Sequence, residues 1–160
     1  MSSWTQDDTG VVTFTGTTIT ELDTITFTID SVTGLIANSL TSIGNDAFKN
    51  YTALTTVTAG KVVSIGEEAF YGCTALKTVT TESLISIGFY AFHQCEALTT
   101  VHAESLESIG EQAFDGCTLL KTVTTESLKS IGVYAFSQCK ALTTVNAGKL
   151  VSLGEGAFEG

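Results

Sequence analysis

The chain has 160 residues, of which 43% are apolar and 15% are charged, a composition that allows one buried core and excludes compositional disorder. Seventeen acidic residues against seven basic ones give a net charge of −10, which disfavours nucleic acids and anionic lipid surfaces as partners. No apolar run approaches the roughly 18 residues of a membrane span, and the first residues lack the basic and apolar regions of a signal peptide. Neither membrane insertion nor a signal peptide is therefore predicted.

The N-terminal part, residues 1–39, alternates apolar residues with threonine in VVTFTGTTI and LDTITFTID. Such alternation is typical of strands. We expect Val11–Ile19 to form a strand that covers one end of the molecule. The segment Leu22–Ser39 is predicted to be an irregular first coil, because its apolar residues are spaced like those of later units: Leu22, Ile25 and Phe27 match Leu54, Val57 and Ala59.

From residue 40 to residue 160 the sequence repeats every 22 residues. A longer period of 44 residues is superimposed on this one, because only 12 of 44 positions differ between residues 66–109 and 110–153. The repeat predicts five full units and a partial sixth, each too small to bury its apolar side alone and therefore stacked on its neighbours. The most regular positions are Gly44, Gly66, Gly88, Gly110, Gly132 and Gly154, together with Phe48, Phe70, Phe92, Phe114, Phe136 and Phe158.

Each unit is predicted to contain three short elements. In LKTVTT, Leu76 and Val79 point inward and the threonines beside Val79 point outward, as in a strand. In SLISIG, Leu84 and Ile87 mark a second inward-facing edge. The segment EEAFYGC groups apolar residues on one face after two acidic ones and so predicts one or two helical turns. The predicted fold class is an α/β repeat solenoid of short parallel strands with short helical or 3-10 turns, behind a β-rich N-terminal cap.

The stretch SIGEEAFYGCTALKTV closely resembles the BspA-like leucine-rich repeat, whose core is I-G-x-x-A-F-x-x-C-x-x-L. The resemblance extends over roughly Leu40 to Gly160 in six tandem copies. It implies a curved leucine-rich-repeat solenoid at an extracellular or cell-surface location, which binds proteins of a host or of neighbouring cells, and it brings no catalytic residues. The family usually has a proline in the segment that corresponds to TTESL. This chain has none, so we expect that loop to differ.

Cysteine and histidine are the residue types in this chain that could act as metal ligands or in catalysis. Tyr51 takes the cysteine position in the first unit, which indicates a packing position and favours buried free thiols over disulfides or zinc ligands. His93 and His102 are replaced by serine and asparagine one 44-residue block later, so we interpret both as solvent-facing variation, with a general base or a metal ligand as the alternative. The cysteines at the repeated position are Cys73, Cys95, Cys117 and Cys139.

Acidic residues hold one position in three successive units, at Glu82, Glu104 and Glu126. They predict a solvated acidic strip, or alternatively a Ca²⁺ site that would relieve the repulsion between stacked carboxylates. No nucleophile–base pair and no glycine-rich phosphate loop stands out. Apart from the Ca²⁺ alternative and the alternative roles named for the histidines, we therefore expect no metal site, and we expect no enzymatic activity, no cofactor and no small-molecule ligand.

The strand face is the predicted binding surface, because leucine-rich repeats present it as the concave side. We expect it to bind a protein or a glycan partner. The face is poor in the aromatic and arginine residues that dominate hot spots, so one contact is expected to be modest and display in many copies to add avidity. The candidate residues are Thr56, Thr58, Lys77, Thr78, Thr80, Thr100, His102, Lys121, Thr122, Thr124, Thr144 and Asn146.

Two alternatives rest on other properties of the repeat. The chain stops inside the sixth unit, so we expect an uncapped last coil through which the protein self-assembles or docks as a fibre or virion component, with Leu153 and Phe158 at the assembly end. A fragment of a longer array would leave the same end open. The T-x-T spacing also resembles the threonine arrays of some ice-binding solenoids, a minor alternative because ice needs a flat surface.

Overall fold

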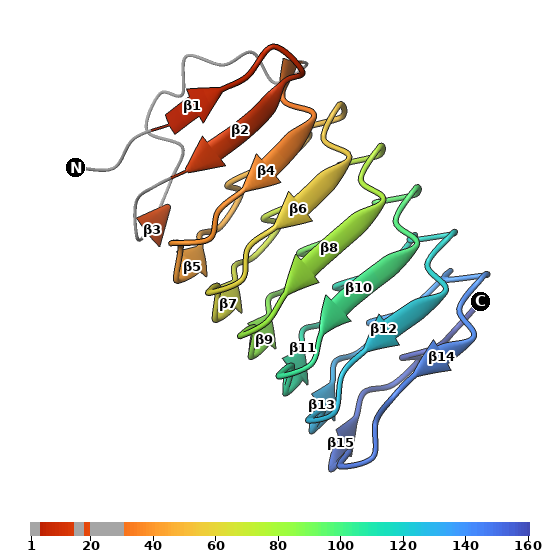
Figure 1. Cartoon of the computed structure of the whole chain (residues 1–160). Helices are drawn as coiled ribbons and strands as arrows, with labels where there is room; N and C mark the ends of the chain where they lie inside the picture. Colours follow the sequence, from red (N-terminus) through yellow and green to blue (C-terminus); the bar gives the residue numbers. More distant parts are fainter. Residues whose placement is uncertain (1–3, 15–17, 20–30) are drawn as a thin grey trace.

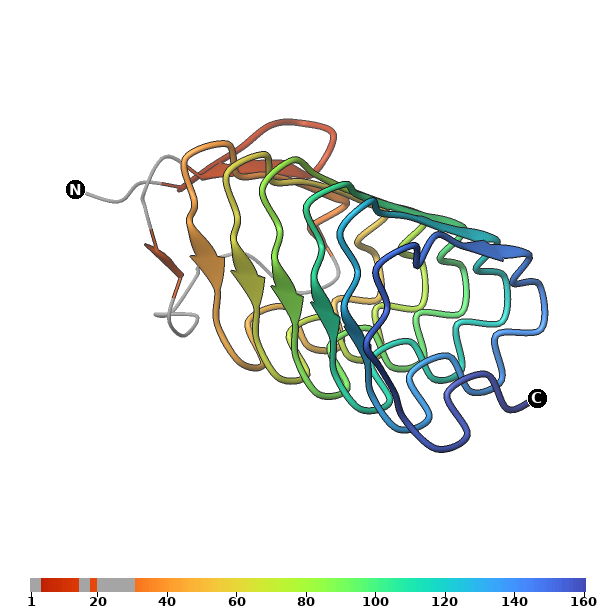
Figure 2. The ribbon, with the colours of Figure 1, turned by 90° about the horizontal axis from the view of Figure 1, so that it is seen from below.

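A computed structural model of the chain describes residues 4–14, 18–19 and 31–160. Within these residues the chain winds into a stack of coils, and the repeated coils each contribute one strand to each of two sheets (Figure 1). Turns close the third side of each coil (Figure 2). The N-terminal strands and the last coil lie at opposite ends of the stack.

The larger sheet has eight strands in the order β1-β2-β4-β6-β8-β10-β12-β14. β1 pairs antiparallel with β2, and the remaining pairs are parallel. Its repeated strands are rich in valine and threonine, which suit a half-buried pleated surface. The bounds are Trp4–Gln6 for β1, Val11–Phe14 for β2, Gly34–Ile36 for β4, Thr56–Thr58 for β6, Thr78–Thr81 for β8, Thr100–Ala103 for β10, Thr122–Thr124 for β12 and Thr144–Val145 for β14.

The smaller sheet has seven strands of two residues each, in the order β15-β13-β11-β9-β7-β5-β3. All its pairs are parallel. From β5 to β13 each strand is a serine followed by a buried isoleucine, so the predicted second inward-facing edge is present. The bounds are Thr18–Ile19 for β3, Ser42–Ile43 for β5, Ser64–Ile65 for β7, Ser86–Ile87 for β9, Ser108–Ile109 for β11, Ser130–Ile131 for β13 and Ser152–Leu153 for β15.

The third side of each coil differs from the short helical or 3-10 turns that the sequence predicted, so the solenoid of parallel strands is confirmed but the α/β class is not. The described residues contain no α-helix, and hence none of the length and hydrophobicity needed to cross a bilayer. The segment is a series of turns in which Glu68 has a positive φ of 51°. The N–H of Phe70 donates to the carbonyl oxygen of Ala91 in the next coil, at 2.8 Å. A single helical turn would leave most of its backbone groups unpaired, whereas these turns pair them along the stack.

The N-terminal strands also differ from the prediction. Leu35 of β4 is in register with Val57 of the next coil; the predicted matches Leu22, Ile25 and Phe27 lie outside the described residues. The predicted single strand Val11–Ile19 forms two strands in different sheets, β2 and β3. The outermost strand of the large sheet at this end is β1, which pairs antiparallel with β2.

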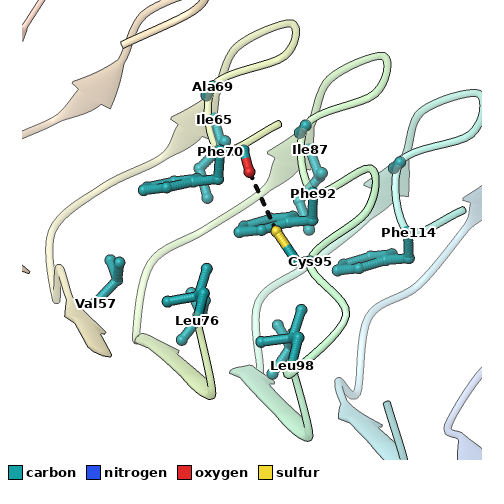
Figure 3. Close-up of a cluster of buried hydrophobic side chains, with 14 of the residues drawn as sticks. Val57, Ile65, Ala69, Phe70, Leu76, Ile87, Phe92, Cys95, Leu98 and Phe114 are labelled. Atoms are coloured by element: carbon teal, nitrogen blue, oxygen red, sulfur yellow. Dashed lines mark hydrogen bonds between the residues drawn. The ribbon is translucent and has the colours of Figure 1, made fainter. Parts of the chain in front are cut away.

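A column of phenylalanine rings runs through the core (Figure 3). The ring of Phe92 stacks on those of Phe70 and Phe114, each with centroids 5.2 Å apart. The stacking continues in both directions, to Phe48 and to Phe158. Leucine, valine, isoleucine, alanine and cysteine at fixed repeat positions, together with Tyr51, fill the rest of the core. Each coil thus buries its phenylalanine against its neighbours, as a stacked repeat requires.

The cysteines occupy the packing position that the sequence predicted, and all four are free and buried. Each thiol donates a hydrogen bond to a phenylalanine carbonyl oxygen of the preceding coil. Figure 3 shows the bond from Cys95 to Phe70, 3.1 Å long. Burial raises the pKa of Cys73 and Cys139 to about 12, so these thiols are protonated at neutral pH and behave as small apolar side chains.

The repeated glycine before each turn segment is explained by close contact between coils. A Cβ added at Gly132 would lie 2.5 Å from the backbone nitrogen of Glu111 in the preceding coil. Atoms this close would have to move apart, and the obstacle is backbone. Gly132 does not have a positive φ, so the reason for glycine here is the narrow space between neighbouring backbones.

Candidate binding surface on the large sheet

The predicted binding residues lie on the outward face of the large sheet, onto which Figure 1 looks. In β6, Val57 is buried while Thr56 and Thr58 on either side are exposed. Successive side chains of a strand point to opposite faces, so the valines face the core and the residues beside them face outward. We call this outward surface the strand face.

Two columns of residues run along the strand face, in register from coil to coil. The first column is threonine throughout, and the second is threonine with one histidine. Paired strands lie about 4.8 Å apart, so each column presents its polar groups at that interval. The first column is Thr56, Thr78, Thr100, Thr122 and Thr144, and the second is Thr58, Thr80, His102 and Thr124, with exposed Asn146 following β14.

Lysine and threonine alternate one residue before the first column. Lys77 and Lys121 are exposed at this position. In the coils that follow them, the hydroxyl of Thr99 donates to the carbonyl oxygen of Lys77, and that of Thr143 to the carbonyl oxygen of Lys121, each at 3.0 Å. Threonine hydroxyls of the following coils thus bind the backbone of both lysines. The two lysine side chains make this edge of the strand face basic.

The opposite edge of the strand face is acidic. Glu82, Glu104 and Glu126 follow the strands of three successive coils and are exposed. Among the described residues no three His, Cys, Asp or Glu side chains form a group that could hold a metal ion. The strand face is therefore basic at one edge, acidic at the other and rich in hydroxyl groups between them, which equips it for hydrogen bonding and charge pairing.

His93 is not the solvent-facing residue that the sequence predicted. Its side chain is 15% exposed and its ring contacts those of Tyr71 and Tyr90 on the turn side of the stack. Its Nδ1 atom lies 3.5 Å from the carboxylate of Asp115, and burial lowers the pKa of His93. Tyr71, Tyr90 and Asp115 come from three coils. In the sequence, the only signal of these contacts was that His93 departs from the repeat. His102 is exposed, as predicted.

The last coil exposes residues whose equivalents are buried in other coils. Leu153 is 55% exposed and Phe158 is 49% exposed. Phe158 stacks on Phe136 with centroids 5.3 Å apart. Leu153 and Phe158, the two predicted assembly residues, therefore lie on a surface that the next coil covers elsewhere in the stack.

Solved structures of bacterial leucine-rich repeat proteins share this architecture. One from Bacteroides ovatus is 28% identical with a TM-score of 0.70, covering 81% of this chain and 38% of its own. A leucine rich cell surface protein of Faecalibacterium prausnitzii is 27% identical with a TM-score of 0.66, covering 98% of this chain and 50% of its own. Pneumococcal vaccine antigen PcpA, at 22% identity and a TM-score of 0.66 over 98% of this chain and 47% of its own, shares the fold. The chain thus spans half or less of these proteins.

The amino-acid sequence also matches a known repeat family. The match is to the BspA type leucine rich repeat region, in six copies over residues 20–101 and 41–160. No curated protein matches the chain. The matched ranges take in the coils described above, whose register is the 22-residue spacing of the sequence. The chain belongs to the BspA type leucine rich repeat family.

Proposed function

We propose that this chain is a non-enzymatic recognition module, which binds a protein or glycan partner through the strand face, the concave side of its solenoid, at an extracellular or cell-surface location. The observation that carries the proposal is the column of five threonines in register from Thr56 to Thr144. Family membership supports an interaction role, and one relative is described as a cell surface protein.

The chemistry of the strand face suits a polar partner of extended shape. Its hydroxyl groups both donate and accept hydrogen bonds, and the strand register holds them in place before a partner arrives, which lowers the entropic cost of binding. Lys77 and Lys121 would pair with acidic groups of the partner. The face has few hot-spot residues, so several copies acting together would supply the affinity.

The test is to select peptides that bind the chain from a random displayed library and to compare their affinities across variants. Lys77→Thr with Lys121→Thr removes both charges and installs the residue that Thr99 has at the equivalent position, so the fold is kept. We expect the double variant to bind the selected peptides about tenfold more weakly, the effect of losing two exposed ion pairs.

Lys140→Thr is the matched control for this experiment. It removes one exposed lysine in the turn after Cys139, where Thr118 holds the equivalent position one 22-residue unit earlier. We expect this variant to bind the selected peptides as the unmodified chain does. Equal affinities for all three proteins would mean that binding does not use the strand face.

A second candidate function is that of a structural building block that assembles through its last coil. The ring of Phe158 stacks on Phe136 at 5.3 Å and is still 49% exposed. A further coil of the same repeat would fit this surface, whether a second copy or more of the same array provides it. A head-to-tail contact that does not close would produce a fibre.

Assembly is tested by measuring particle mass by light scattering over a wide concentration range, with electron microscopy of the same samples. We expect growth beyond the 16.8 kDa of one chain and its loss in Leu153→Lys, which places a charge in the contact. Val63→Lys is the control, because Val63 is 41% exposed in a central coil and Lys129 holds its equivalent position. A monomer at every concentration would contradict this second function.

A further inference from the structure

Aromatic side chains gather on the turn side of the stack, at positions that most coils fill with other residues. His93 stacks on Tyr71 with ring centroids 5.0 Å apart and meets the ring of Tyr90 edge-on at 4.8 Å. Phe89 in turn contacts Tyr90 edge-on, with centroids 3.9 Å apart. We call Tyr71, Phe89, Tyr90 and His93 the aromatic cluster.

The stack itself does not require aromatic residues at these positions. The turns are joined by backbone hydrogen bonds, such as the one from the N–H of Tyr90 to the carbonyl oxygen of Glu111, 3.1 Å long. One block later, the residues equivalent to Phe89 and His93 are Val133 and Ser137, and the same backbone bonds form there. Tyr134 keeps the ring at the position of Tyr90. Because the same bonds form without rings at the positions of Phe89 and His93, the packing of the coils does not explain why these two residues are aromatic.

Carboxylates flank the aromatic cluster in the coils on both sides. Glu67 and Glu111 hold the position of Phe89 in the preceding and following coils, and both are exposed. The N–H of Glu68 donates to the carbonyl oxygen of Phe89 at 2.9 Å, which places that coil directly beside it. Phe89 and Tyr90 are half-buried, so their rings are held by the stack while part of their surface meets solvent.

A cation from the chain itself already binds beside the aromatic cluster. The Nζ atom of Lys49 lies over the ring of Tyr71, 5.3 Å from its centroid. The same atom pairs with the carboxylate of Asp46 at 3.0 Å and with that of Glu68. An aromatic ring and carboxylates together are a favourable site for an ammonium or guanidinium group. Lys49 is therefore an example, within this chain, of a cation held by a ring and carboxylates on the turn side of the stack.

We propose that the turn side around Phe89 and Tyr90 is a second interaction surface, which binds a basic segment of a partner protein. A lysine or arginine side chain of the partner lies against the two rings and pairs with Glu67 and Glu111. The net charge of −10 attracts such a segment, and the fixed rings limit the entropy lost on binding. This surface is separate from the strand face. Binding here would explain why aromatic residues gather on the turn side of the stack and not on the strand face.

The experiment is an NMR titration of the chain with a capped Gly-Arg-Gly-Arg-Gly peptide. We expect shift changes at residues 67–71, 89–93 and 111–115. Phe89→Val is expected to weaken binding about threefold to fivefold, and it uses the residue that Val133 has at the equivalent position. A peptide that does not bind, or shift changes spread evenly over the acidic surface, would overturn the proposal.

Two single charge changes separate a site from general charge attraction. Glu67→Gln and Glu155→Gln each remove one carboxylate at the same repeat position, but only Glu67 is next to Phe89 along the stack. We expect Glu67→Gln to weaken binding of the peptide and Glu155→Gln to leave it within error of the unmodified chain. Equal effects of the two variants would show attraction by net charge alone and would overturn the proposal.

Discussion

The thiol of Cys95 donates a hydrogen bond to the carbonyl oxygen of Phe70 in the preceding coil, over 3.1 Å. The same carbonyl oxygen accepts the backbone N–H of Cys73 at 3.2 Å. One oxygen thus ties together the turn of its own coil and the side chain of the next. The bond recurs at each of the four cysteines, which makes the cysteine position part of the contact between coils.

We expect the four thiols to resist modification in the folded protein. They are buried, and burial raises the pKa of Cys73 and Cys139 to about 12, so the reactive thiolate is scarce at pH 8. Labelling with Ellman's reagent should be slow without denaturant and should reach four thiols per chain in urea. Cys139, 8% exposed, should react first. Rapid labelling of all four in the native protein would contradict the buried arrangement.

Replacing one ring in the phenylalanine column should cost more in the middle than at the end. Phe92 is fully buried between two other rings, so Phe92→Ala should lower the free energy of unfolding by about 3–5 kcal/mol. Phe158 stacks on one ring and is half exposed, so Phe158→Ala should cost clearly less. Urea unfolding followed by circular dichroism measures both, and equal losses would contradict a continuous ring column.

Adding a methyl group at two glycines should have unequal effects. At Gly132 the new Cβ would lie 2.5 Å from backbone atoms of the preceding coil, whereas at Gly148 no atom lies within 4 Å. Gly132→Ala should therefore destabilise the protein by about 1–3 kcal/mol, because neighbouring backbones must separate. Gly148→Ala should be nearly neutral. The melting temperatures of the two variants give the comparison, and similar values would argue against close packing at Gly132.

The free energy of unfolding should decrease as the pH falls below 6.5, because of the lowered pKa of His93. Burial lowers its pKa in the folded state from 6.5, although Asp115 and Glu68 act in the opposite direction. Below pH 6.5 the unfolded chain binds this proton more readily than the folded one, so the free energy of unfolding decreases until the folded-state pKa is reached. Urea unfolding at several pH values measures how steeply the free energy of unfolding changes with pH.

His93→Ser is the variant that isolates this effect, because Ser137 holds the same position one block later. It should flatten the dependence on pH in that window. His102→Asn, which installs the residue found at position 146, is the matched control at the other histidine, which is exposed on the strand face. An identical slope in the unmodified chain and in His93→Ser would exclude His93 as its source.

The sequence alone determined the repeat, its length and the inward residues. Phenylalanine and valine that recur every 22 residues are buried when equivalent residues of neighbouring coils contact one another. The register of Val57 with Val79 and Val101 follows from this. The same logic predicted the buried cysteines, because Tyr51 replaces one of them at a position defined by packing. It also predicted which threonines would stand beside the valines, since strand side chains alternate between faces.

The third side of each coil and the surroundings of His93 depend on contacts between coils, which no single repeat unit reveals. The spacing of Ala69, Phe70 and Cys73 fits one face of a helical turn as well as it fits the turns that form. The choice depends on backbone hydrogen bonds to the next coil, such as the one from Phe70 to Ala91, and no local pattern encodes those. His93 likewise meets Tyr71 and Asp115 because stacking brings together residues 22 positions apart, and a ring that looks like surface variation in the sequence is covered by its neighbours in adjacent coils.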